Sequence, residues 1–240
     1  PPATQNQKLG RARPIAHETA HMWFGDLVTM KWFNDVWMKE VFANFMAAKI
    51  VNPSFPEVDH DLRFLLSHYP SAYEVDRTEG TNPIRQPLAN LNEAGQLYGA
   101  IIYQKAPIVM RQLEMTVGVD GLRDGLRQYL KAHAFGNATW SELISVLDQR
   151  TPEDLGTWSR VWVEEEGRPQ IATELRLASD HIEGLAYVQR DPLGRSGIVW
   201  PQRIKVALGY ASGVEVLDVR LNGAVTEIAD ARGRPVPLFV

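Results

Sequence analysis

Two histidines and two glutamates near the start of the chain have the residue types and spacing of a metal-dependent hydrolase. His17 and His21 stand four residues apart in the run His-Glu-Thr-Ala-His, and Glu40 follows after eighteen intervening residues. Four residues of an α-helix advance about 400° and rise about 6 Å, so both imidazoles lie on one helix face. We therefore predict that His17 and His21 bind one metal ion.

The two glutamates take different roles around that ion. A catalytic zinc has three protein ligands and one open position, and a carboxylate from a second helix completes a two-histidine, one-glutamate set. Glu40 lies in a largely apolar helical segment, from about Asp35 to Lys49, where a charge needs a partner. Glu18 points to the neighbouring edge of the first helix, where it reaches a metal-held water as general base. The pattern predicts one Zn²⁺ per chain, held by His17, His21 and Glu40.

The segment between the two helices carries turn signals. Gly25 follows the first helix, as expected of a residue that ends a helix. Asn34 and Asp35 are typical residues at the start of a helix, so we expect the second helix to begin there. The chain is thus predicted to fold back and bring the two helices together.

A longer stretch resembles a known family. The run HETAHMWFGDLVTMKWFNDVWMKEVFA, residues 17–43, is similar to the zinc aminopeptidases of the aminopeptidase N group. Residues 102–106 and 109–114 resemble the family segment that contains a catalytic tyrosine, and residues 81–84 and 158–169 resemble two further family landmarks. The resemblance covers about residues 10 to 170.

This resemblance implies a function and one more site residue. It maps the family's tyrosine onto Tyr103, which would otherwise be one of seven tyrosines with packing as its ordinary role. A phenol hydrogen bond to the developing oxyanion would add to the pull of zinc on the same oxygen. By resemblance, the enzyme is a metallopeptidase whose substrates are peptides from which it releases N-terminal residues.

Departures from the family pattern leave ligands and base intact. Val41 replaces a glycine after the third ligand, Ala47 replaces a glutamate, and Ala106 replaces a glycine after the Tyr-x-Lys; residues 26, 82 and 99 also differ. Val41 and Ala106 are expected to reshape the substrate pocket. The family's Gly-Ala-Met-Glu-Asn-like strand, whose glutamate binds the substrate amine, does not occur in residues 1–16. We therefore expect that the remainder of a parent polypeptide lies upstream, and that this segment alone is weakly active or inactive.

Composition excludes several classes of partner. With 240 residues, 45% of them apolar, and a net charge of −4, the chain can bury a sizeable core and does not favour nucleic acid. It has no cysteine, so it forms no disulfide or thiolate metal site. No apolar run approaches about 18 residues, so no membrane span is expected in this segment. The compartment stays open, with a cytoplasmic location slightly favoured.

The hydrophobic periodicity changes near residue 170. Before it, helical patterns dominate, and Thr139 with Glu142 indicates a capping box. The expected helices span residues 90–117, with a break or kink at Pro107, and residues 120–133, 139–149 and 152–166. After it come short alternating segments at residues 171–177, 182–189, 203–208, 214–221 and 224–228. We predict an α+β fold, with a mostly α-helical, thermolysin-like catalytic subdomain over residues 1–169 and a small β-sandwich-like domain over residues 170–240.

Two other functions remain open at this point. A metallo-endopeptidase would be favoured if no upstream strand supplied an amine-binding glutamate. A non-catalytic interaction module could retain the peptidase fold for partner binding. Intact ligands and an intact base argue against the non-catalytic module, and the family resemblance implies the aminopeptidase.

Overall fold

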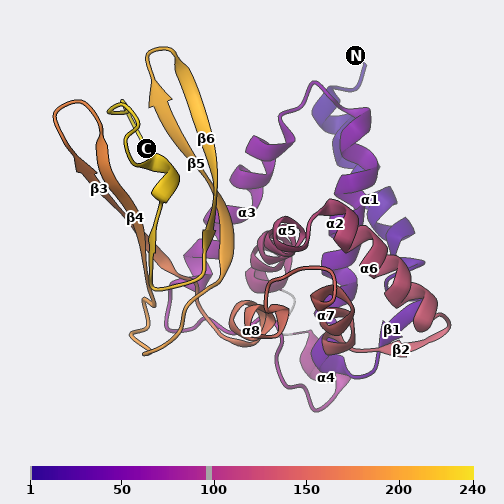
Figure 1. The fold of residues 1–240 in the computed structure, drawn as a ribbon. Coiled ribbons are helices and arrows are strands. Elements are labelled where there is room, and N and C mark those ends of the chain that lie inside the picture. Colours follow the sequence, from indigo (N-terminus) through magenta and orange to yellow (C-terminus); the bar gives the residue numbers. More distant parts are fainter. Residues whose placement is uncertain (1, 96–98) are drawn as a thin grey trace. The chain divides into compact units, whose positions relative to one another are not determined.

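The computed structural model describes residues 2–95 and 99–240 of the chain, and its fold is α+β (Figure 1). The chain divides into two compact units: a mainly helical unit that ends at Glu166, and a β-unit, Gly167–Val240. Within the described ranges, no helix combines the length and apolar character that crossing a bilayer requires. The helices are α1 Gln5–His21, α2 Trp37–Val51, α3 His60–Asp76, α4 Leu91–Ala94, α5 Ala106–Val117, α6 Val119–Ala132, α7 Trp140–Asp148 and α8 Leu155–Ser159.

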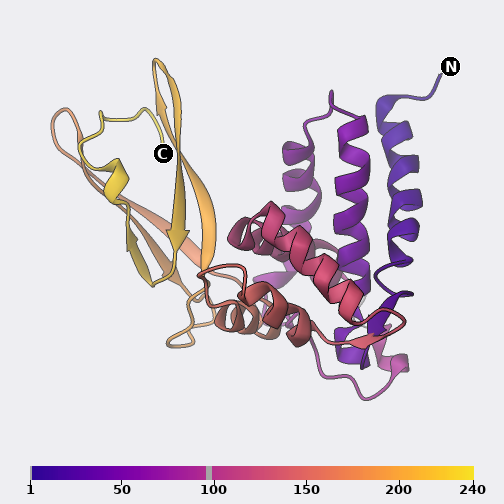
Figure 2. The same ribbon diagram turned by 45° about the vertical axis from the view of Figure 1, so that its right-hand side comes forward.

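Helices α1 and α2 run antiparallel, side by side, and form the frame of the site (Figure 2). Helix α1 begins with a capping box in which Thr4 and Gln7 each satisfy the other's backbone N–H. Leu9 and Ala16 of α1 pack against Ala47 and Val51 of α2, and the two alanines allow the helices to approach closely. The pairing brings the last turn of α1 beside the first turn of α2.

The turn after α1 depends on a glycine, as the sequence predicts. Gly25 has φ of +141°, a conformation that L side chains rarely adopt, and a Cβ there would lie 3.3 Å from the His21 carbonyl oxygen. The chain then forms β1, Val28–Met30, which pairs in parallel with β2, Gly136–Ala138. A residue other than glycine at position 25 would therefore strain the backbone directly beside His21.

The expected start of the second helix at Asn34 and Asp35 is wrong. Residues Phe33–Asp35 form a 3₁₀ turn, and α2 begins at Trp37 with no side-chain cap. The Asp35 carboxylate is buried; it accepts from Arg85 Nε at 2.6 Å and from the Trp140 backbone N–H at 3.3 Å. The Asp35 side chain therefore forms an ion pair with a distant residue, although the local sequence pattern predicts that it caps α2.

The helix expected over residues 90–117 is interrupted. Its described parts are α4, the π-helical turn η3 at Ile101–Lys105, and α5; residues 96–98 lie outside the described residues. Pro107 lies in the first turn of α5, directly after this π turn. The predicted break at Pro107 is thus a change from π to α geometry.

The remaining helical predictions differ in outcome. Helices α6 and α7 match their predicted segments, and Thr139 with Glu142 forms the expected capping box. The segment predicted over residues 152–166 contains α8 and then a second π-helical turn, η4, Arg160–Glu164. Helix α3 was not anticipated, although Asp59 caps it through a hydrogen bond from the Leu62 N–H.

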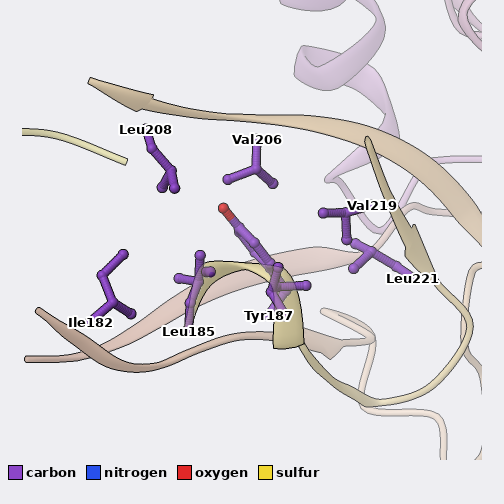
Figure 3. Close-up of a cluster of buried hydrophobic side chains, with 9 residues drawn as sticks. Ile182, Leu185, Tyr187, Val206, Leu208, Val219 and Leu221 are labelled. Carbon is purple, nitrogen blue, oxygen red and sulfur yellow. The ribbon is translucent and has the colours of Figure 1, made fainter. Parts of the chain in front are cut away.

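The β-unit consists of two small sheets that share one core. Strand β4, Ile182–Arg190, pairs antiparallel with β3, Gln170–Leu177, and with β7, Val225–Glu227. Strand β5, Gln202–Tyr210, pairs antiparallel with β6, Gly213–Leu221. Figure 3 shows side chains from both sheets pointing toward one another, namely Ile182, Leu185, Tyr187, Val206, Leu208, Val219 and Leu221. This arrangement is sandwich-like, as the alternating pattern predicts.

Candidate metal and catalytic site

The paired helices bring the three predicted metal ligands together. His17 Nε2 lies 3.1 Å from His21 Nε2, 3.5 Å from one Glu40 carboxylate oxygen, and the second oxygen lies 3.9 Å from His21 Nε2. One ligand atom from each residue falls within 4.8 Å of the others. The side chains are between 14% and 20% exposed, so the cluster is largely screened from water and opens on one side.

Both imidazoles are oriented by contacts at their other nitrogen. His21 Nδ1 lies 3.1 Å from the Phe24 carbonyl oxygen, which only accepts, so Nδ1 carries the proton. His17 Nδ1 lies 3.1 Å from Asn44 Oδ1, which favours the same tautomer. Both Nε2 atoms therefore present lone pairs to one point, together with the Glu40 carboxylate.

This donor set fits zinc. Tetrahedral coordination at zinc–nitrogen and zinc–oxygen distances near 2.0–2.2 Å places neighbouring ligand atoms about 3.3 Å apart, close to the separations in the cluster. Two lone pairs and a carboxylate at such distances repel one another, and a cation removes that repulsion. With three protein ligands, a fourth position stays open for water or substrate.

A cleft of about 930 Å³ runs past the cluster, and both predicted catalytic side chains line it. Glu18 is exposed on the last turn of α1, and Tyr103 is half-buried on η3. His17 lines the same cleft, so a ligand held there would meet one metal ligand, the predicted base and the predicted phenol. The volume suffices for a peptide segment of several residues.

Two side chains that line this cleft, Arg13 and His68, have shifted pKa values. Burial lowers the pKa of the Arg13 guanidinium, and the nearby Arg63 lowers it further. Burial also lowers the pKa of His68, against the opposing effect of hydrogen bonds to the Gln104 side chain and the Tyr103 backbone. His68 is therefore held mainly neutral near pH 7, while Arg13 keeps its charge.

Asn44 is a site residue that the sequence analysis missed. It lies four residues after Glu40, so helical spacing places it on the same face of α2, one turn further on. That spacing is a signal that could have identified it. Val41 and Ala106 are buried, at 0% and 1% exposure, and neither lines the cleft, so their expected effect on the pocket would be indirect and stays a prediction.

An HExxH helix whose third ligand is a glutamate from the next long helix defines a class of zinc metallopeptidase domain. Residues 2–162, more than half of the chain, match the Peptidase family M1 domain. The chain belongs to peptidase family M1, which confirms the resemblance found in its sequence.

Known relatives support this membership. The chain is 32% identical over 244 residues to aminopeptidase N of Streptomyces lividans, a match that covers 95% of this chain and 28% of the relative. It is 37% identical over 164 residues to tricorn protease-interacting factor F2 of Thermoplasma volcanium, covering 68% and 21%. It is 34% identical over 165 residues to leucyl aminopeptidase of Saccharolobus solfataricus, covering 69% and 21%. The chain spans 21% to 28% of the length of these relatives.

Proposed function

We propose that this protein hydrolyses peptide bonds with the help of zinc and releases N-terminal amino acids from peptides. One observation carries the proposal: His17, His21 and Glu40 offer ligand atoms within 4.8 Å of one another, beside a cleft that Glu18 and Tyr103 line. Membership of family M1 and relatives named as aminopeptidases support it.

In this proposal His17, His21 and Glu40 hold the metal ion. When bound there, zinc would polarise the scissile carbonyl and make water a stronger nucleophile near neutral pH. Glu18 takes a proton from the attacking water and passes it to the leaving amine, as a general base and then a general acid. Tyr103 donates its phenol hydrogen bond to the oxygen on which negative charge develops.

The proposal also assigns roles to the two units. All five of these residues lie in the unit that ends at Glu166, so that unit would carry the chemistry. We propose that residues 1–169 and 170–240 are separate domains, of which the second takes no part in bond cleavage. Peptides are the proposed substrates, because the volume of the cleft beside His17 suffices for several residues.

A peptide-cleavage assay tests the reaction and its direction. The zinc-loaded full-length protein should release the first residue of a peptide with a free amine, and N-acetylation should abolish that release. Glu18→Gln should keep zinc and lower kcat at least about 10²-fold, whereas Glu79→Gln, at an exposed turn, should leave both unchanged. Internal cleavage of the acetylated peptide would indicate an endopeptidase instead. Absence of any Glu18-dependent cleavage would overturn the proposed activity.

A further inference from the structure

The turn that carries Tyr103 is unusual within its helix. Residues Ile101–Lys105 form a π-helical turn, in which the Ala106 N–H bonds to the Ile101 carbonyl oxygen before α5 begins. Eight residues of the run 101–110 are buried, and the other two, Tyr103 and Gln104, line the cleft. A π turn holds one residue more than an α turn; its loss would rotate the preceding residues by about 100°. The direction of the Tyr103 side chain therefore depends on keeping this turn.

A buried ion pair anchors the turn two residues after Tyr103. Lys105 Nζ lies 2.9 Å from Asp76 Oδ1, at the end of α3, and the two side chains are 4% and 0% exposed. The Thr81 hydroxyl donates to the same oxygen at 2.9 Å. The pair joins the Tyr103 segment to the landmark at residues 81–84, to which no function was assigned from sequence.

A second set of contacts joins α3 to the same π turn. His68 lies eight residues before Asp76 in α3, and its Nδ1 is 2.8 Å from Gln104 Oε1. His68 also forms a hydrogen bond with the backbone of Tyr103. Helix α3 thus holds the π turn at residues 103, 104 and 105. An ion pair this deeply buried is costly to desolvate, and stability alone is a weak reason for it, because apolar side chains often stabilise as well.

We propose that the Lys105–Asp76 ion pair is a positioning device for Tyr103, which keeps the π turn in the form that directs the phenol into the cleft. This rests on the proposed function, in which Tyr103 acts on the oxyanion. Lys105 and Asp76 are positioning residues, since they reach substrate only through Tyr103. Their contribution should then disappear when the phenol hydroxyl is absent.

A double-mutant cycle tests this dependence in the zinc-loaded full-length protein. Tyr103→Phe should lower kcat by roughly 10²–10³ with a smaller change in KM. Lys105→Met should lower kcat at least about 10-fold with zinc content unchanged, but less than about threefold in the Tyr103→Phe background. Arg85→Met breaks the ion pair to Asp35 instead, and any loss of kcat there should be the same in both backgrounds.

Two further variants distinguish the positioning role from a general loss of stability. Lys105→Met with Asp76→Leu removes both charges, so it should recover thermal stability while kcat stays low. Thr81→Val should lower kcat in the same direction by a smaller factor. Recovery of full kcat in the double variant would overturn the inference, as would an equal effect of Lys105→Met in both Tyr103 backgrounds. Unchanged kcat in Tyr103→Phe would instead overturn the role of Tyr103 itself, and the positioning role with it.

Discussion

Asn44 offers the sharpest test of the metal site, because its only proposed task is to orient one ligand. Its amide oxygen accepts from His17 Nδ1 at 3.1 Å and so directs the Nε2 lone pair toward the metal position. The equivalent partner of His21 is a backbone carbonyl, which no side-chain substitution removes. Loss of such an outer contact lowers metal affinity by about 10- to 100-fold, or about 1.4 to 2.8 kcal/mol.

The position of Asn44 decides where in that range each variant falls. Asn44 lines the cleft, so in Asn44→Ala a water can enter the vacated space and accept the His17 proton. We expect a loss of zinc affinity of about 10-fold. Asn44→Leu keeps the volume and excludes water, so its loss should approach about 100-fold. Asn44→Asp keeps the acceptor and should bind zinc at least as tightly as the parent protein.

The measurement is a competition titration for zinc against a chromophoric chelator at fixed pH. Asn137→Ala serves as a control, because it removes an exposed amide that bonds the Met30 carbonyl, away from the ligands. The expected order of dissociation constants is Leu above Ala, and Ala above the parent and Asp variants. Equal affinity in the Leu, Ala and parent proteins would refute the orienting role of Asn44.

Four further predictions concern zinc content, metal-dependent stability, the helix cap of α7 and its pH dependence. His17→Ala and Glu40→Ala should each lose about one zinc per chain and unfold at a lower temperature, since the metal joins two helices; undiminished zinc in elemental analysis would contradict the ligand assignment. A strong chelator should lower the melting temperature of the parent protein and leave that of His17→Ala unchanged, as read by circular dichroism. Thr139→Ala should cost about 1 kcal/mol in denaturant unfolding. Hydrogen bonds from Thr139 hold the pKa of Glu142 below its usual range. The stabilisation that the Glu142 carboxylate provides is therefore present above the usual pKa and is lost as the pH falls through the lowered pKa. A destabilising effect of Glu142→Gln that persisted at low pH would contradict this.

The capping box and the strands show how much local sequence predicts. Thr139 and Glu142 are three residues apart, and their interaction needs only the helix that they begin. The segments predicted after residue 170 likewise match β3 to β7, and buried side chains of β4, β5 and β6 pack on a shared core. Interactions confined to one element can be recognised from spacing alone.

Other features depend on residues far apart in the chain. Asp35 has the type and position of a helix cap, yet Arg85, fifty residues later, takes its carboxylate. Helix α3 contains Pro70 and few buried residues, so its periodicity is weak, and its place follows from contacts with η3. Val41 and Ala106 are buried rather than exposed in the cleft, and it is packing that decides which face of a helix meets solvent.

By itself, the sequence determined the kind of site. His17 and His21 share a helix face by their spacing, and Glu40 is a charge in an apolar segment that requires a partner. The tertiary structure decided how that site is held: Asn44 against His17, and Lys105 with Asp76 behind the turn of Tyr103. The physical reason is the range of the interactions. Periodicity along one helix fixes which side chains point together, whereas a buried ion pair or a π turn forms only where distant segments pack against it.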